Sequence, residues 1–340
     1  MVTVAVDAGG ADLGPAEVAA GAAIAAAGGI RVILFGSAAE IGAAPAGVEL
    51  IDAPVSIAKA TDPAFAARST PQASIVQAAR AVAEGRAQAL VSGGSTGTAL
   101  AAALFEIRRD RGIHRPALAL PLPVPGGSPV VVLDVGANVI CRPEHLVQFA
   151  HMGSAFAHAV LGIQRPRVAL LSNGEEAGKG TPDLAEVHER LSGAAGTGLR
   201  FEGNIEGTRL FDGGVDVVVT DGFTGNVALK LIEGTSGATL RVLHATAALT
   251  ARGRLADRLL VPVLAELRAQ IDPETQGGAY MLGLRQVGVV AHGRFTRHGF
   301  ARAIERAARS VQEDVVGATR QALSAAGALR APAGPGLVKS

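Results

Sequence analysis

Residues 88–109, Gln-Ala-Leu-Val-Ser-Gly-Gly-Ser-Thr-Gly-Thr-Ala-Leu-Ala-Ala-Ala-Leu-Phe-Glu-Ile-Arg-Arg, show most clearly the unit from which the whole chain is built. An apolar run (88–92) ends in a glycine-rich polar turn (92–98), and an Ala- and Leu-rich segment follows (98–109). A short aliphatic run without polar alternation is typical of a strand that is covered on both faces, and a helix directly after it is half of a βαβ unit. The stretch therefore predicts a mainly parallel sheet flanked by helices.

The same alternation recurs along the chain. Aliphatic runs lie at residues 3–6, 31–35, 48–51, 88–92, 117–120, 130–134, 167–172, 216–220 and 287–291. Helical patterns lie at residues 15–27, 71–84, 98–109, 143–161, 183–191, 226–249, 255–269 and 300–324. We therefore expect an α/β protein with three α/β/α layers. Residues 1–325 should form one catalytic domain, either as one body or as two subdomains that share a cleft, and residues 326–340 a flexible tail.

Composition narrows the class of protein. With 49% hydrophobic and 18% charged residues in 340, the chain is globular rather than disordered. The 31 basic and 30 acidic residues leave a net charge of +1, which gives no electrostatic footprint for nucleic acid. The single cysteine excludes a disulfide framework and fits a reducing cytoplasm. The N-terminus has no basic signal region, and the apolar stretch 18–30 is too short to span a bilayer, so we expect a soluble protein or one that lies on a membrane surface.

Polar, glycine-containing turns follow five of the expected strands, at residues 7–12, 92–98, 134–138, 172–180 and 221–226. Open α/β sheets bind ligands just beyond the carboxyl ends of their strands. If all five turns lie at one edge of the sheet, they form a single polar cleft.

The turn 92–98 has the features of an anion site. It opens directly into a helix, whose N-terminus offers free N–H groups and positive potential, and Ser95, Thr96 and Thr98 add hydroxyl groups. A helix capped by these side chains, without a ligand, is the alternative. The turn 221–226 has the same design, in which Asn226 is either an N-cap or an amide directed at a substrate oxygen. Lys179 is either a solvated surface charge or a cation that stabilises a developing oxyanion.

Several familiar motifs are missing. No G-x-G-x-x-G occurs, so a dinucleotide site of that type is not expected, and residues 174–181 are one residue short of a P-loop. The histidines include no H-x3-H pair, and Cys141 fits a small hydrophobe better than a nucleophile. We expect no cofactor and no metal.

With these turns in hand, the chain resembles the PlsX-type phosphate acyltransferases of bacterial phospholipid synthesis over roughly residues 2–325. Six blocks carry the resemblance: Leu133-Asp134-Val135-Gly136-Ala137-Asn138, Gln148-Phe149-Ala150-His151-Met152-Gly153, Asn173-Gly174-Glu175-Glu176 with Lys179-Gly180, Gly203-Asn204-Ile205-Glu206-Gly207, Asp221-Gly222-Phe223-Thr224-Gly225-Asn226-Val227, and Ala291-His292-Gly293.

The resemblance implies a fold like that of isocitrate dehydrogenase and phosphotransacetylase, and a homodimer. It implies transfer of a fatty acyl group from acyl-carrier protein to inorganic phosphate, which gives acyl phosphate. It further implies peripheral association with the membrane and delivery of the product to a membrane glycerol-phosphate acyltransferase. By motif match, Lys179 and Asn226 fall on the family positions implicated in catalysis.

The chain also departs from the family pattern. Asp7-Ala8-Gly9-Gly10-Ala11-Asp12 stands for Asp-Ala-Met-Gly-Gly-Asp, and Ser95 stands for an Asn. The basic stretch before a Ser-Ser pair is reduced to Arg68-Ser69-Thr70-Pro71, and Leu-Arg-Gln-Val-Gly replaces Val-Asn-Gly at 284–288. These changes concern the phosphate and carrier-protein contacts and the choice of acyl donor.

Phosphate is itself an anionic nucleophile, so the protein has to position it and stabilise the oxyanion. We expect phosphate on the turn formed by Ser92, Ser95, Thr96, Gly97 and Thr98. Lys179 and Asn226 would stabilise charge, and Asp7, Asp12, Asp134, Asn138 and Asp221 would orient the donors. The sequence does not identify the lining of an acyl groove.

The segment 252–268 carries an apolar helical face with arginines around it, interrupted by Pro262. It predicts either a helix that faces the core or a dimer interface, or an amphipathic element that lies on a membrane. The membrane-facing candidates are Leu255, Leu259, Leu260 and Val263.

Three other functions stay open. One is a phosphotransacetylase-like transferase that uses an acyl-coenzyme A. Another is a catalytically impaired, membrane-associated scaffold. The third, a decarboxylating dehydrogenase on the same fold, would need an aspartate metal cluster and a nucleotide loop, and neither is assembled in the sequence.

Overall fold

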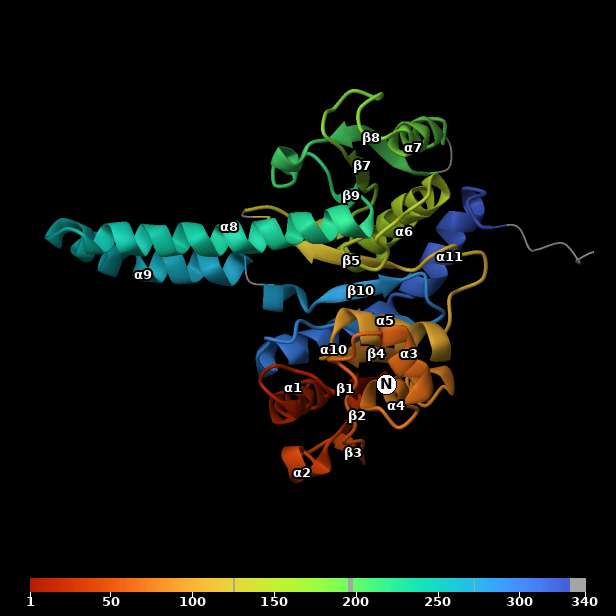
Figure 1. Cartoon of the computed structure of the whole chain (residues 1–340), viewed down its shortest axis with the longest axis vertical. Coiled ribbons are helices and arrows are strands. Elements are labelled where there is room, and N and C mark those ends of the chain that lie inside the picture. Colours follow the sequence, from red (N-terminus) through yellow and green to blue (C-terminus); the bar gives the residue numbers. More distant parts are fainter. Residues whose placement is uncertain (125, 195–197, 272, 331–340) are drawn as a thin grey trace, which may run out of the picture.

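One 11-stranded sheet runs through the protein in the order β3-β2-β1-β4-β11-β10-β5-β6-β9-β7-β8 (Figure 1). The computed structural model describes residues 1–124, 126–194, 198–271 and 273–330. The strands are β1 (Thr3–Asp7), β2 (Arg31–Gly36), β3 (Val48–Asp52), β4 (Ala89–Ser92), β5 (Ala117–Leu122), β6 (Val130–Leu133), β7 (Arg167–Leu171), β8 (Arg200–Ile205), β9 (Val217–Val219), β10 (Ala279–Leu282) and β11 (Val287–Val290).

Every expected aliphatic run forms a strand, and every expected helical pattern forms a helix. The helices are α1 (Pro15–Ala27), α2 (Ala38–Ile41), α3 (Pro63–Ser69), α4 (Ser74–Ala83), α5 (Thr96–Glu106), α6 (Pro143–Leu161), α7 (Pro182–Ser192), α8 (Gly222–Ala248), α9 (Ala251–Ile271), α10 (Arg297–Gln312) and α11 (Val315–Ala325), with short 3-10 turns η1 (Gly207–Arg209) and η2 (Pro273–Gln276). The sequence reading missed β8, β10, α2 and α3.

The single helix expected at 300–324 is two helices. Asp314 adopts the left-handed conformation (φ 47°), which ends the helical path. Its carboxylate then accepts a hydrogen bond from the Gly317 N–H (3.1 Å), so that it caps α11.

Helices cover the sheet on both faces, which confirms the three-layer architecture. On one face, α1, α6, α7, α10 and α11 bury a core that includes Phe149, Phe156 and Phe300. On the other face, α4 covers β2, β1 and β4 and α5 packs on β11, with Phe35 and Leu90 in the core.

The strands do not all run in one direction. Seven neighbouring pairs are parallel, but β11–β10, β10–β5 and β5–β6 are antiparallel. The strands β6, β9 and β7 therefore run opposite to β1 and β4. The expectation that the five polar turns share one edge of the sheet is wrong, because the antiparallel pairing of β5 with β6 reverses β6, β9 and β7. The unforeseen strand β10 is antiparallel to both β11 and β5, so those two strands run in the same direction.

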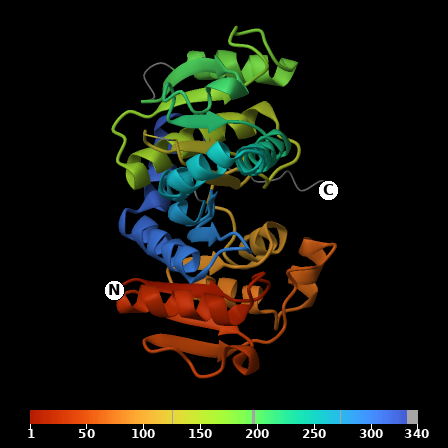
Figure 2. The ribbon, with the colours of Figure 1, turned by 90° about the vertical axis from the view of Figure 1, so that its left-hand side faces the viewer.

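The helices α8 and α9 form an antiparallel hairpin that projects from the body beyond the sheet (Figure 1) and points toward the viewer in Figure 2. The helix α9 continues through Pro262. Among the described residues, no helix combines the length and apolar character that crossing a membrane requires.

The predicted tail, 326–340, falls only partly within the described chain, because residues 331–340 lie outside it. The described part ends against the body, where the Arg330 N–H donates to the carbonyl of Gly112 (2.8 Å).

Candidate active site

A cleft of about 1080 Å³ lies over β5, on the face of the sheet that α4 and α5 also cover. Its rim runs from the N-terminus of α5 to the first turns of α8. Polar lining residues are Asp12, Lys59, Ser95, Thr96, Asn226, Lys230, Glu233, Ser236 and His292. The apolar lining includes Leu118, Leu120, Leu122, Phe211, Leu229, Ile232 and Phe295.

The first wall of the cleft is made where the turns after β1, β4 and β11 meet the loop 56–60. The Asp12 N–H donates to the carbonyl of Gly293 (2.8 Å), which ties the first turn to the last. A Cβ atom at Gly94 would lie 2.8 Å from the Gly9 carbonyl oxygen and 3.5 Å from the Ala58 Cβ, so only glycine allows this approach.

A buried carboxylate braces this wall. Asp7 accepts hydrogen bonds from the hydroxyls of Ser74 (2.6 Å) and Ser92 (2.8 Å) and from the Gly9 N–H (2.9 Å). Burial raises the pKa of Asp7 to about 6, although these hydrogen bonds act in the opposite direction. Asp7 and Ser92 are fully enclosed, so they shape the wall from behind and do not line the cleft.

The helix α5 begins at this wall. Ser95 is its N-cap: the Ser95 hydroxyl accepts from the Thr98 N–H (3.4 Å) and lies 2.9 Å from the Thr98 hydroxyl. Thr98 is buried and bonds back to the Ser95 carbonyl, whereas Ser95 and Thr96 line the cleft. Gly97 is exposed and rests against Pro63 of α3. The first N–H groups of a helix have no partner within it, so this end can hold an anion.

The second wall carries the turns after β6 and β9. Asp134 is fully buried and accepts four backbone N–H groups, from Leu118, Gly136, Ala137 and Asn138 (2.7–3.0 Å), together with the Asn138 side-chain amide (2.8 Å). Burial raises the pKa of Asp134. The Asn138 amide also donates to the Pro116 carbonyl (2.7 Å). Both side chains therefore hold the turn in shape.

The helix α8 starts four residues earlier than the sequence suggested. Asp221 is its N-cap and accepts from the Thr224 N–H (2.9 Å) and the Thr224 hydroxyl (2.7 Å). The N-cap alternative for Asn226 is therefore wrong. Asn226 lies inside the helix, is exposed, and lines the cleft.

Sheet twist explains how turns from strands of opposite direction share one cleft. Each strand rotates by roughly 20–25° relative to its neighbour. Five steps separate β4 from β9, so the accumulated rotation is roughly 100–125°. The ends of these two strands are then no longer on opposite sides of the molecule.

Lys179 is not among the residues that line the cleft. It is exposed in the turn after β7, and its side chain lies against Gly174, where a Cβ atom would be 2.8 Å from the Lys179 Cγ. Strands β7 and β9 are parallel neighbours in the sheet. The turn that holds Lys179 follows β7, and the start of α8 follows β9, so both lie at the carboxyl ends of adjacent strands.

Sequence reasoning missed Lys59, His292 and the apolar floor of the cleft. Lys59 is one of only four lysines, and His292 belongs to a recognised sequence block. The floor is marked by Leu118, Leu120 and Leu122, which alternate along β5 and share one face.

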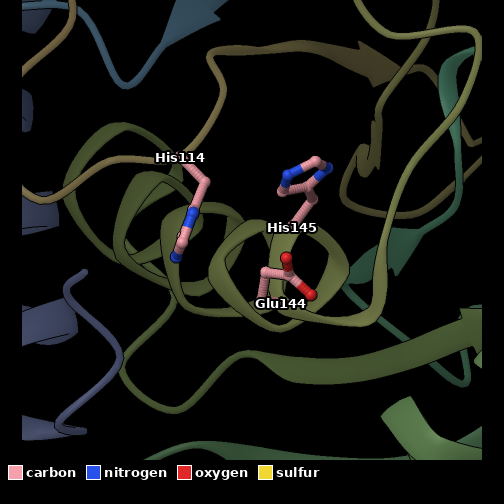
Figure 3. A group of neighbouring side chains, drawn as sticks. All are labelled: His114, Glu144 and His145. Carbon is pink, nitrogen blue, oxygen red and sulfur yellow. The ribbon is translucent and has the colours of Figure 1, made fainter. Parts of the chain in front are cut away.

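The structure also groups His114 with Glu144 and His145, from the loop before β5 and the first turn of α6 (Figure 3). The Arg142 N–H donates to His145 Nδ1 (3.1 Å), so the neutral ring carries its proton on Nε2 and has no free lone pair for a cation. Glu144 pairs with the Arg142 guanidinium (3.9 Å). We assign no metal to this group.

Cys141 fits the expectation of a packed thiol. Burial raises the pKa of its thiol to about 12, so the nucleophilic thiolate is scarce near neutral pH.

Four helix residues expected to face either a core or another surface lie on the outside of the hairpin. Leu255 and Leu259 are 61% and 70% exposed, and Leu260 and Val263 are exposed too. The alternative in which these four residues face the core of the chain is therefore wrong, while the dimer and membrane alternatives stay open.

Comparison with known proteins gives consistent matches over nearly the whole chain. A family model described as "Fatty acid synthesis protein" matches residues 2–318. A phosphate acyltransferase of Pelotomaculum thermopropionicum is 42% identical over 319 residues, 92% of this chain and 91% of that protein. A phosphate acyltransferase of Geobacillus thermodenitrificans is 41% identical over 327 residues, 95% of this chain and 99% of that protein.

Among solved structures, the EutD phosphotransacetylase from Staphylococcus aureus matches with a TM-score of 0.59 and 15% identity, over 91% of this chain and 94% of that chain. A branched-chain phosphotransacylase from Enterococcus faecalis matches with a TM-score of 0.57 and 17% identity, over 92% of this chain and 99% of that chain. At such low identities these matches establish the fold, which is phosphotransacetylase-like as expected.

Proposed function

The chain belongs to the fatty acid synthesis family of phosphate acyltransferases and is an acyltransferase, and we propose that it moves a fatty acyl group from acyl-acyl-carrier protein to inorganic phosphate for phospholipid synthesis. In this reaction a phosphate oxygen attacks the thioester carbonyl carbon, the carbon–sulfur bond breaks, and the proton of hydrogen phosphate ends on the departing thiolate.

One observation carries the proposal of a fatty acyl donor: a large cleft joins a polar end to an apolar floor. The polar end lies at the start of α5, and the floor is the row of leucines on β5 facing Leu229 and Ile232 of α8. The cleft volume of about 1080 Å³ slightly exceeds the range of about 300–1,000 Å³ that is usual for sites of drug-sized ligands. An acetyl group would leave most of the apolar floor uncovered. A long acyl chain would cover this apolar surface.

In the proposed mechanism, phosphate sits at the N-terminus of α5 and the thioester carbonyl faces Asn226. The Asn226 amide donates a hydrogen bond to the tetrahedral oxyanion. Thr96 and the Ser95 cap belong to the phosphate end, while Asp7, Asp134 and Asn138 hold the turns in place and touch no substrate.

Lys179 is proposed to add positive charge from the turn beside the start of α8. Because its side chain lies outside the cleft in this conformation, this role requires the turn 172–180 to move toward Asn226. The variants Lys179→Ala and Lys179→Arg test it: kcat should fall in the first and recover in part in the second. Wild-type kcat in Lys179→Ala at saturating phosphate would remove Lys179 from the mechanism.

A trapping assay tests the reaction as a whole. The protein is incubated with phosphate and one of three donors: long-chain acyl-carrier protein, long-chain acyl-coenzyme A or acetyl-coenzyme A. Hydroxylamine then converts acyl phosphate to hydroxamate. We expect the fastest phosphate-dependent formation with acyl-carrier protein.

The other outcomes of the assay separate the alternatives. Faster reaction with a coenzyme A thioester would assign that donor. Absence of hydroxamate with all three donors would overturn the transferase proposal and favour a membrane-associated scaffold.

We also propose that the exposed apolar face of α9 rests on the membrane surface, where product passes to a membrane glycerol-phosphate acyltransferase. Leu255, Leu259 and Val263 would enter the interface, and Arg254 and Arg258 would meet anionic headgroups. Flotation with phosphatidylglycerol-containing vesicles tests this. Binding should be lost in Arg254→Glu/Arg258→Glu and retained in the matched surface variant Arg31→Glu/Arg86→Glu.

The proposed homodimer has its own test. Light scattering after size exclusion gives the mass in solution, and Leu255→Asp/Leu259→Asp asks whether the same face joins two copies. A dimer that dissociates in this variant would assign the face to the subunit interface instead of the membrane.

A further inference from the structure

Three residues on the first wall of the cleft, Asp12, Lys59 and His292, carry groups that can distinguish phosphate from a similar anion. Resting on the proposed function, we propose that Lys59 and His292 donate hydrogen bonds to phosphate oxygens while the Asp12 carboxylate accepts one from the phosphate's P–OH group. The site would then select phosphate over sulfate.

The first step is the placement of Asp12 beside His292. The Asp12 N–H donates to the Gly293 carbonyl (2.8 Å), and a Cβ atom at Gly293 would lie 3.3 Å from each carboxylate oxygen of Asp12. The carboxylate is thus held against the residue next to His292. Both Asp12 and His292 line the cleft.

Lys59 comes to the same wall from the loop 56–60. Its neighbour Ala58 contacts Gly10 and lies 3.5 Å from the position of a Cβ at Gly94, and all three residues line the cleft. The loop therefore meets the turn of Asp12 on one side and the turn before α5 on the other.

Two lysines line the cleft, and Lys59 is the one whose ammonium group is not already paired with a carboxylate in the part of the chain that the structure describes. Lys230, the other lysine in the lining, is paired with Glu233 at 2.8 Å. Within residues 1–124, 126–194, 198–271 and 273–330, neither Lys59 nor the Asp12 carboxylate has a hydrogen-bond or ion-pair partner. Among the described residues, one with a free ammonium and one with a free carboxylate line the same cleft.

The tautomer of His292 is fixed by its surroundings. The Arg294 N–H donates to Nδ1 (3.2 Å), and the ring stacks on Phe295 with a centroid distance of 6.1 Å. Because Nδ1 accepts a hydrogen bond, the neutral ring carries its proton on Nε2. His292 thus offers a hydrogen-bond donor and is not set up as a general base.

Two donors and one carboxylate acceptor match a protonated oxyanion. Both forms of phosphate that are present near neutral pH carry a P–OH group, whose O–H can donate a hydrogen bond to a carboxylate. Sulfate has the same shape and no such proton, so it would face the Asp12 carboxylate with repulsion instead of a hydrogen bond. A site built to bond a hydroxyl group rejects an analogue that lacks it.

Calorimetry of the full-length protein with phosphate and with sulfate, without an acyl donor, tests the proposal. In the wild type, phosphate should bind at least tenfold more tightly than sulfate. In Asp12→Asn, phosphate affinity should fall at least tenfold, and the preference for phosphate should nearly vanish. Lys59→Met should weaken both anions at least tenfold.

The histidine is tested by a pair of variants, His292→Leu and His292→Gln. The first should weaken phosphate binding, and the second should recover part of it by supplying an N–H donor. Arg190→Met, which removes an exposed cation paired with Glu186, is the matched control for loss of surface charge and should leave both affinities unchanged. Melting curves of all variants check that they fold.

Several results would overturn the site: no saturable phosphate binding, equal affinity for sulfate in the wild type, or unchanged selectivity in Asp12→Asn. Because these measurements need no acyl donor, they are independent of the hydroxamate assay. Selective phosphate binding without hydroxamate would retain this site and reject the proposed reaction.

Discussion

The two walls of the cleft follow the same plan with one difference. Each has a glycine-containing turn braced by a buried carboxylate, Asp7 or Asp134, and each starts a helix at the cleft. The helix α5 is capped by the neutral Ser95, whereas α8 is capped by the carboxylate of Asp221. A charged cap offsets the positive end of a helix, and a neutral cap leaves that potential to a ligand. The comparison favours the proposal that phosphate binds at α5 and that α8 supplies the amide of Asn226.

The largest expected effect comes from the amide on the second wall. Asn226→Ala should lower kcat about 10²- to 10³-fold, as loss of one oxyanion donor does, with little change in the KM for phosphate. Initial rates of hydroxamate formation measure both. Asn226→Asp keeps the shape of the side chain without the N–H donor and should be equally slow. A kcat within threefold of wild type in Asn226→Ala would separate α8 from the chemistry.

Asp7, the buried carboxylate that braces the first wall, should affect how the stability of the protein depends on pH. The pKa of Asp7 is raised to about 6 from its ordinary 3.8, so between these values the folded protein binds a proton that the unfolded chain does not. The Asp7 contribution to the free energy of unfolding therefore increases as the pH falls. From pH 7.5 to 4.5 the gain is about 2 kcal/mol, and Asp7→Asn should lack it.

Denaturant titrations of the wild type and Asp7→Asn across this pH range measure the difference. The two stability curves should converge or cross as the pH falls, with Asp7→Asn relatively more stable at pH 7.5. Parallel curves would show that the carboxylate is not carrying this burial penalty.

Exchanging the charges of the two N-cap residues tests directly whether the neutral cap of α5 is what favours phosphate there. Ser95→Asp retains a side chain that can cap α5 but places a negative charge at the proposed phosphate end. We expect the KM for phosphate to increase about tenfold, equivalent to about 1.4 kcal/mol. Asp221→Asn, the corresponding neutral cap on α8, should change this KM less. Equal changes in the two variants would remove the distinction between the walls.

The smallest expected effect is on the cap alone. Ser95→Ala should lower the free energy of unfolding by about 1 kcal/mol because the Thr98 N–H loses its acceptor. Thr181 caps α7 in the same way, through the Leu184 N–H (3.3 Å), so Thr181→Ala is a matched control for stability. Only Ser95→Ala should also raise the KM for phosphate. An equal kinetic effect in Thr181→Ala would trace the change to stability.

The local parts of the fold were predictable because the local physics is strong. Continuous aliphatic runs such as 130–134 and capped helices such as 143–161 can be recognised directly from the sequence. The position of β10 in the sheet was not predictable, since it is a four-residue segment behind two glycines and nothing local marks its pairing with β5. The direction of β6, β9 and β7 relative to β4 is set by a different pair, the antiparallel strands β5 and β6.

The candidate site, like the fold, could be predicted from the sequence only in part. The turns of Ser95 and Asn226 were read from glycine and helix-start patterns, and both line the cleft. Lys59 and His292 escaped because each is a single side chain in a loop, and only the contacts of Gly10, Gly94 and Gly293 bring them together. Asp134 lies in a turn that the sequence identified, but its burial behind the cleft and its five hydrogen bonds appear only in three dimensions.

The position of β11 and β10 in the middle of the sheet sets an order on synthesis. The strand β4 leaves the ribosome with β1 as its partner, but its other neighbour, β11, starts only at Val287. At about 5–20 residues per second, the edge of β4 waits roughly 10–40 s. An uncovered edge strand is a template for pairing with other chains, so the nascent protein should depend on chaperones until its last fifth has emerged.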